Sequence, residues 1–160
     1  MITTNITTEQ LQRAKTLYPF SSLNGSITKG KSNIYGAIGE IIIQDHYAHK
    51  NTNTNPTYHY DLTIENLKVD VKTKKTTVTP LPHYLCSISA FNTTQQCDYY
   101  IFCRVNTTLT TCFILGYKDK QAFFKEATFN KKGSPDVNGW TFKDDCYNLP
   151  IAALNPVTPA

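Results

Sequence analysis

The chain has 160 residues, enough for one domain with a hydrophobic core of its own. Hydrophobic residues make up 40% of it, which excludes a disordered chain, and 16 Lys and Arg against 12 Asp and Glu leave a formal charge of +4. This mild positive charge is compatible with a polyanionic partner but is too small to identify one. We expect a single domain over residues 1–160.

Cysteine usage and apolar runs indicate where the protein resides. An odd, dispersed set of five cysteines without a CxxC pair is poor material for disulfides or a zinc site. Cys103 and Cys112 lie among strand-like apolar residues, so we expect them to be buried thiols in a reducing compartment. The first residues lack the charged and apolar regions of a signal peptide, and no apolar run reaches membrane-spanning length. These features predict a cytoplasmic protein that does not contact a membrane.

The first part of the chain is predicted to form two helices. Thr7 or Thr8 can cap a helix that reaches about Tyr18, with Gln10 completing a capping box to Thr7. A loop rich in Ser, Gly and Lys follows, and apolar periodicity predicts a second helix over residues 33–47. Residues 49–57 are expected to form a polar loop.

The rest of the chain is predicted to contain mostly strands. Strands are expected at residues 58–64 and 67–75, joined at residues 65–66, and at residues 97–105 and 110–117. Residues 81–96 are expected to hold a further strand and a short helix capped by Asn92. A helix over 119–127, a turn at 131–136, a short strand near 140–142 and a closing segment at 147–156 follow. This order predicts an α/β or α+β fold.

The hairpin at residues 58–75 carries the main chemical signal. With its turn at residues 65–66, apolar side chains share one face, and Asp61 lies directly opposite Asp70 on the other. The side-chain roots of such a pair lie about 5 Å apart, so the two charges repel unless a cation or a shared proton relieves them. Lys72 follows on the same face, about 7 Å along the strand, and the same register places His59 beside it.

Two carboxylates beside a lysine are a side-chain set that can support metal-dependent hydrolysis of a phosphodiester. The carboxylates can bind Mg²⁺, which polarises a phosphate oxygen and acidifies water, while the lysine orients the attacking water and stabilises developing charge. The alternative is an exposed hairpin face that is simply charged and solvated. The hairpin alone does not decide between these interpretations.

The order of these residues along the chain resembles that of the active-site residues in the PD-(D/E)XK nuclease superfamily, which has the restriction-endonuclease-like fold. Its members carry an acidic residue on a helix, then an Asp beginning a hairpin, then a (D/E)xK motif on the second strand. The matching residues are Glu40 in NIYGAIGE, Asp61 in YHYDL and Asp70-Val71-Lys72 in VDVKTKK. The resemblance is best over residues 29–105 and looser up to residue 156. Tyr60 stands where the family name has Pro.

This resemblance implies an α/β fold with a central mixed β-sheet flanked by helices, and an Mg²⁺-dependent (or Mn²⁺-dependent) nuclease. Asp61, Asp70, the Val71 carbonyl and Glu40 would bind the metal, and Lys72 would position the water. The catalytic set would be Asp61, Asp70, Lys72 and Glu40. Glu40 shares its helix face with small residues, which favours approach to the hairpin, although the same pattern fits a solvated stripe.

The resemblance also suggests the partner. The substrate would be nucleic acid, with DNA favoured over RNA, and the small stand-alone form would suit a phage-encoded enzyme acting in the host cytoplasm. Nucleic-acid contacts are expected from residues flanking the cleft, namely Lys29, Lys31, Asn33, Lys74 and Lys75.

Two other classes of function stay open at this point. One is a catalytically silent nucleic-acid-binding module on the same fold, and the other is a protein-interaction domain with a charged hairpin. Metal-dependent cleavage separates the nuclease from both, and salt-dependent nucleic-acid binding separates the remaining two. The sequence leaves open whether cutting is internal or terminal, and whether the chain forms a homodimer.

Overall fold

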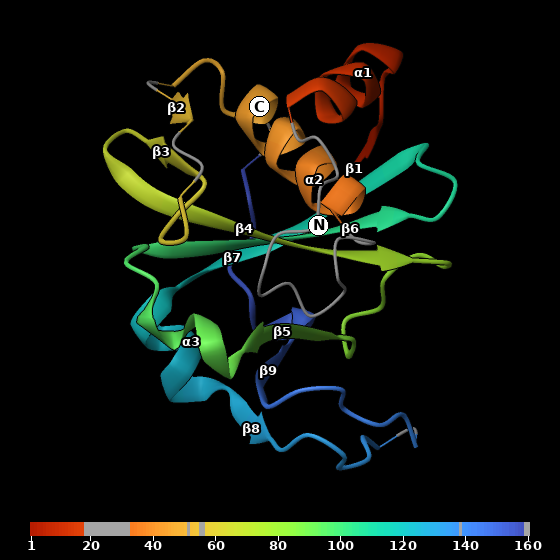
Figure 1. The fold of residues 1–160 in the computed structure, drawn as a ribbon, viewed down its shortest axis with the longest axis vertical. Coiled ribbons are helices and arrows are strands. Elements are labelled where there is room, and N and C mark those ends of the chain that lie inside the picture. The colour runs from red at the N-terminus through yellow and green to blue at the C-terminus, as the bar shows by residue number, and fades with distance from the viewer. Residues whose placement is uncertain (18–32, 51, 55–56, 138, 159–160) are drawn as a thin grey trace.

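The computed structural model describes residues 1–17, 33–50, 52–54, 57–137 and 139–158. Over these residues the chain is an α/β structure with a mixed six-stranded sheet, a three-stranded sheet and three α-helices. Helices α1 and α2 lie on one face of the large sheet, while α3 and the small sheet lie on the other (Figure 1).

The elements follow one another in the order β1 (Ile2–Asn5), α1 (Thr8–Leu17), α2 (Asn33–His46), β2 (Thr52–Thr54), β3 (Leu62–Ile64), β4 (Leu67–Thr76), β5 (Leu85–Ser89), the 3-10 helix η1 (Ala90–Thr94), β6 (Tyr99–Asn106), β7 (Thr111–Asp119), α3 (Lys120–Glu126), β8 (Thr128–Asn130), β9 (Cys146–Pro150) and the 3-10 helix η2 (Ile151–Ala153). The large sheet has the strand order β1-β7-β6-β4-β3-β2, and the small sheet has the order β5-β9-β8. Strands β4 and β6 are parallel, and the other named strand pairs are antiparallel.

The first helix begins as its sequence predicts. The Thr7 N–H donates to Gln10 Oε1 at 3.0 Å, and the Gln10 N–H donates to Thr7 Oγ1 at 3.1 Å. This reciprocal capping box satisfies two N–H groups that an α-helix cannot bond internally. The expected end of this helix at Tyr18 lies outside the described residues.

Helix α2 packs directly on β4 because it carries a glycine at the contact. A Cβ built on Gly39 would lie 2.0 Å from Thr73 Oγ1, so a larger residue does not fit without movement of the strand side chain. The apolar side chains of α2 that predicted the helix, among them Ile38 and Ile41, are buried in this contact. Glu40 follows Gly39 and is therefore held close to the sheet.

The large sheet separates two hydrophobic cores. Val69 and Val71 of β4 face α2, together with Ile101 and Val105 of β6. Because successive strand residues point to opposite faces, Asp70 and Lys72 face the side of α3 and the small sheet. The aromatic core on that side includes buried Tyr100, Phe102 and Phe123. Cys103 and Cys112 are buried, as expected, and so are the other three cysteines.

Several short elements differ from the prediction. Strands β1 and β2 form where the sequence predicted a polar terminus and a polar loop, and β8 was also missed. These strands have only three or four residues and no clear apolar alternation. They form because their backbones bond to a neighbouring strand, which their own sequences do not indicate. Helix η1 is capped by Ser89 instead of Asn92, and the strand expected near residues 140–142 is reduced to one bridge between Pro135 and Thr141.

Within the part of the chain that the structure describes, no helix combines the length and apolar character needed to cross a bilayer.

Two glycines of α2 provide a matched test of this packing. Gly39→Ala should destabilise the protein by about 1–3 kcal/mol, because the new methyl group collides with Thr73. Gly36→Ala should instead stabilise it by up to about 1 kcal/mol, because nothing lies within 4 Å of the added carbon and alanine favours the helix. Chemical denaturation of the two variants measures the difference; equal stability would contradict the close contact.

Candidate active site

One edge of β4 is only partly covered. The pairs Ile64–Leu67, Thr63–Lys68 and Leu62–Val69 form in the predicted register. Before Leu62, however, the chain turns away from the sheet, with the Thr57 N–H donating to the Tyr60 carbonyl at 3.2 Å. Strand β4 continues to Thr76, so no described strand covers this edge from Asp70 onward.

The pairing of Asp61 opposite Asp70 that the register predicted does not form. The Asp61 N–H instead donates to the Val69 carbonyl at 3.0 Å, and Asp61 Oδ2 accepts the Val71 N–H at 2.7 Å. The Asp61 carboxylate thus takes the place of a neighbouring strand. Because the N–H and C=O of one strand residue point to the same edge, the Val71 carbonyl also faces this open edge.

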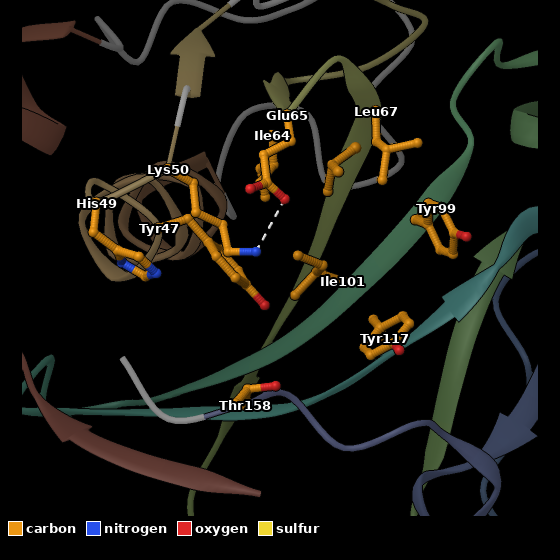
Figure 2. Close-up of a pocket in the computed structure, with 11 residues that line it drawn as sticks. Tyr47, His49, Lys50, Ile64, Glu65, Leu67, Tyr99, Ile101, Tyr117 and Thr158 are labelled. Atoms are coloured by element: carbon orange, nitrogen blue, oxygen red, sulfur yellow. Dashed lines mark hydrogen bonds and ion pairs between the residues drawn. The ribbon is translucent and has the colours of Figure 1, made fainter.

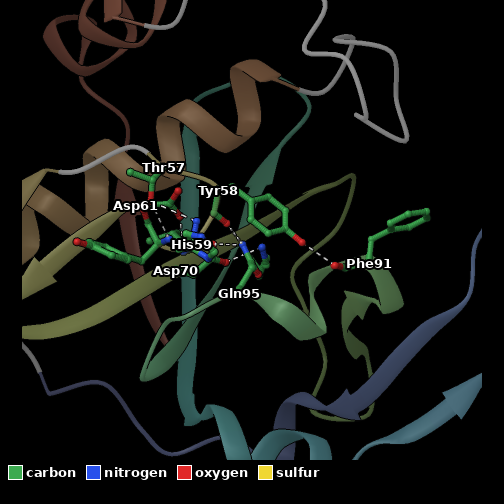
Figure 3. Close-up of polar contacts among 10 residues, drawn as sticks. Thr57, Tyr58, His59, Asp61, Asp70, Phe91 and Gln95 are labelled. Carbon is green, nitrogen blue, oxygen red and sulfur yellow. Dashed lines mark hydrogen bonds and ion pairs between the residues drawn. The ribbon is translucent and has the colours of Figure 1, made fainter.

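Asp70 is deeply buried and held on both oxygens. Its side chain is 3% exposed, with Oδ2 2.5 Å from Lys72 Nζ. The Gln95 amide donates from Nε2 to Asp70 Oδ1 at 2.7 Å. The same Nε2 donates to the Tyr58 carbonyl at 2.9 Å, so Gln95 joins η1, β4 and the loop before Asp61 (Figure 3).

Lys72 lies between Asp70 and an aromatic ring. Its side chain is 21% exposed, and Nζ lies 5.9 Å from the centre of the Tyr100 ring. The ammonium group is thus held by an ion pair on one side and a cation–π contact on the other. The expected pairing of His59 with Lys72 is lost with the strand, and His59 Nδ1 is buried with no hydrogen-bond partner among the described residues.

Electrostatics connect Glu40 to this cluster. Burial raises the pKa of Asp61 well above its usual value, and the negative charges of Asp70 and Glu40 raise it further. The Val71 amide and the Lys72 charge oppose this rise in pKa only in part. Glu40 is half-buried on α2 and near enough to influence Asp61, so several carboxylates act on one another here with a single lysine among them.

The donor set suits a hard, hydrated cation. The described residues contain no group of three or more His, Cys, Asp or Glu side chains placed to hold a metal. The oxygen donors at this edge are the carboxylates of Asp61 and Asp70 and the Val71 carbonyl. Mg²⁺ is commonly bound through one or two carboxylates while it keeps several waters, so this set fits Mg²⁺ and does not fit structural zinc.

The predicted nucleic-acid contacts separate into different places. Lys74 and Lys75 are both exposed, but as successive strand residues they point to opposite faces and cannot line one cleft. Lys74 Nζ donates to Ser87 Oγ of β5 at 2.7 Å. Lys29 and Lys31 lie outside the described residues, as does the side chain of Asn33 at the start of α2.

Gln95 is the main site residue that sequence reasoning missed. It is 4% exposed and lies directly after η1. A glutamine in a short polar segment gives no apolar pattern and no ligand spacing. The one usable signal was its position between a predicted short helix and the predicted strand at residues 97–105.

A separate pocket lies on the α2 face of the sheet. It has a volume of about 370 Å³ and is lined by aromatic and apolar side chains with one ion pair, Lys50–Glu65 at 3.0 Å (Figure 2). Val69 lines it, but Asp70 next in the chain faces the opposite side of the sheet. The pocket is thus distinct from the carboxylate cluster.

Comparison of the sequence with models of known protein families and with curated proteins gives no match. We therefore infer function from the geometry of the site.

The raised pKa of Asp61 gives a pH-dependent prediction. In the unfolded chain this carboxyl loses its proton near about pH 4. In the folded chain it does so only at higher pH, so the wild type loses stability as pH rises between these two values. Asp61→Asn keeps an oxygen for the Val71 amide without the charge. In EDTA it should match wild type below about pH 4 and exceed its stability by about 1 kcal/mol or more above the raised pKa.

Urea denaturation across this pH range tests the expectation. Glu65→Gln is the control, because Glu65 forms an exposed ion pair with Lys50 and should change stability by less than about 1 kcal/mol. A stability difference for Asp61→Asn that stays constant with pH would contradict the proposed charge repulsion.

Proposed function

We propose that the protein is a metal-dependent nuclease with the restriction-endonuclease-like arrangement of the PD-(D/E)XK superfamily. The observation that carries this proposal is the set of groups at the open edge of β4. Asp61 is bonded to the Val71 amide, Asp70 lies next to Val71 in the strand, and Lys72 is paired with Asp70. Two carboxylates, a carbonyl and a lysine thus meet at one edge.

The order of elements also supports the proposal. Glu40 is on the helix before the hairpin, Asp61 immediately precedes β3, and residues 70–72 are on the second hairpin strand. The sheet is mixed, with helices α1 and α2 on one face. This is the order of acidic groups and the kind of sheet that the resemblance implies.

Asp61, Asp70 and the Val71 carbonyl would hold a divalent cation, which would supply a Lewis acid for a phosphate oxygen and lower the pKa of water. Hydrolysis joins a water oxygen to phosphorus and releases one ester oxygen, which takes up a proton. The Lys72 ammonium stabilises the negative charge that develops on the phosphate. Gln95 fixes the Asp70 carboxylate, and Glu40 adds negative charge that favours a cation over an empty site.

One observation favours the alternative of a silent nucleic-acid-binding module. Both Asp70 oxygens already have protein partners, Gln95 and Lys72, so the carboxylate is satisfied without a cation. The two functions differ in one measurable property, the cleavage of nucleic acid when a divalent cation is added.

The direct test is incubation with labelled DNA, and with RNA for comparison, in Mg²⁺, Mn²⁺ or EDTA. The nuclease should cut in either cation and not in EDTA, and added Mg²⁺ should restore activity after chelation. Asp61→Asn and Asp70→Asn should both lose cleavage, because each removes a carboxylate from the cation site. Binding of nucleic acid without cleavage in any cation would favour the silent module instead.

Two lysines of β4 test the assignment of roles. Lys72→Ala should lower the maximal rate at least about a hundredfold while nucleic-acid binding largely survives, because the lost charge acts on the reacting phosphate. Lys74→Ala should leave the rate at saturation nearly unchanged and weaken binding modestly, with a smaller salt dependence. Single-turnover cleavage and salt-titrated binding measure these effects; equal behaviour of the two variants would contradict the assignment.

A further inference from the structure

Helix η1 presents an aromatic side chain to solvent beside the carboxylate cluster. Phe91 is 83% exposed, more than any other aromatic residue among those the structure describes. Tyr58, in the loop before Asp61, is 54% exposed. Both side chains extend to the same side of Gln95, away from Asp70 (Figure 3). A single exposed aromatic residue is common on protein surfaces, but here two exposed aromatic residues are joined by hydrogen bonds.

The backbone that carries Phe91 is fixed by hydrogen bonds. The Tyr58 hydroxyl donates to the Phe91 carbonyl at 2.7 Å and shares a second hydrogen bond with Thr94 Oγ1 at 3.1 Å. Ser89 Oγ accepts the Phe91 N–H at 3.4 Å and so caps η1. Tyr58 therefore joins its own ring to the helix that carries the other ring.

The two rings are also connected to Asp70. The Gln95 amide donates from one nitrogen to the Tyr58 carbonyl and to Asp70 Oδ1. Three segments, at residues 58, 70 and 91–95, thus share one chain of hydrogen bonds, which is exposed at the Tyr58 hydroxyl and buried at Asp70. The Tyr58 ring and the backbone that carries the Phe91 ring are thus fixed relative to the groups proposed to act on the phosphodiester.

Resting on the proposed nuclease function, we propose that Phe91 and Tyr58 form a stacking platform for an unpaired base of the strand that enters the site. Each nucleobase offers a flat face to an aromatic ring, whatever the sequence. In a duplex those faces are already stacked on neighbouring bases, so the platform favours single-stranded or unpaired nucleic acid. Helix η1 carries no acidic side chain that would repel the phosphates of such a strand.

Binding in EDTA tests the platform without cleavage. Phe91→Ala should weaken binding of a labelled oligothymidylate between about fivefold and a hundredfold, the range for losing one base–aromatic stack. Binding of a hairpin duplex should change less than about twofold. A strand that keeps its phosphates but has abasic sites should bind wild type and Phe91→Ala equally, because it has no base to stack.

Matched variants separate stacking from mere apolar area. Phe91→Trp should retain single-strand binding, whereas Phe91→Leu should not. Phe129→Ala is the control, because Phe129 is 48% exposed on β8 of the small sheet, where its ring contacts Tyr147 of β9. Thermal unfolding of each variant verifies that the fold is retained.

The possible results distinguish this proposal from the nuclease proposal. Normal single-strand binding by Phe91→Ala or Phe91→Leu, or equal losses for single strand and duplex, would overturn the platform even if the enzyme cuts DNA. Stacking-dependent binding without cation-dependent cleavage would support the platform and overturn the nuclease. Dimeric wild type together with monomeric Phe91→Ala in sedimentation would show that a second copy, and not a base, covers the ring.

Discussion

The site depends on one backbone requirement, that the Val71 N–H must have an acceptor. A buried N–H without a partner costs as much as a lost hydrogen bond, and an edge strand normally obtains its acceptor from the next strand. Here β3 begins only at Leu62, so the next strand is missing at this point. The Asp61 carboxylate supplies the acceptor at 2.7 Å. A carboxylate is thereby fixed against β4 at the position where the Val71 carbonyl also faces outward, and the arrangement of the remaining groups follows from this contact.

This contact brings together charges that oppose folding. Half-buried Asp61 lies near buried Asp70, Glu40 adds to their repulsion, and Lys72 offsets part of it. Buried carboxylates are tolerated when they are paired or hydrogen-bonded, and Asp70 has both kinds of partner in Lys72 and Gln95. The hydrogen bond from the Val71 amide lowers the pKa of Asp61 too little to offset burial and the negative charges of Asp70 and Glu40, so this pKa is raised. Under the proposed function, a cation bound at this edge would relieve the repulsion, so the charge imbalance that weakens the metal-free fold would favour metal binding.

Sequence reasoning succeeded where one residue type fulfils one local requirement. The Thr7–Gln10 capping box, the apolar face of α2 and the hairpin register up to Leu62 all follow from spacing and are present. It failed where the hydrogen-bond partner of a group is distant in the sequence. The chain leaves the sheet at Asp61, whose carboxylate accepts the Val71 N–H in place of a neighbouring strand. The alternation of apolar and polar residues in the sequence does not reveal such a replacement. Strands β1 and β2 and the residue Gln95 depend in the same way on distant partners. The roles of the site residues stay predictions.

The parallel pairing of β4 with β6 explains why η1 lies near the carboxylates. Parallel strands begin at the same end of a sheet, so the connection from Thr76 must return to the start of β4 before β6 can begin. It does so on the side away from α2, through β5 and η1, and arrives where Asp98 bonds to Lys68 through both its backbone and its side chain. Asp70 is two residues beyond Lys68 on the same face. The returning chain must therefore pass Asp70 just before β6, which is where Gln95 bonds to the carboxylate and where Phe91 reaches solvent one turn earlier. A parallel pairing of these two strands through this layer brings the end of the crossover to the carboxylates, so residues of the crossover can lie beside the site although β4 carries Asp70 and Lys72.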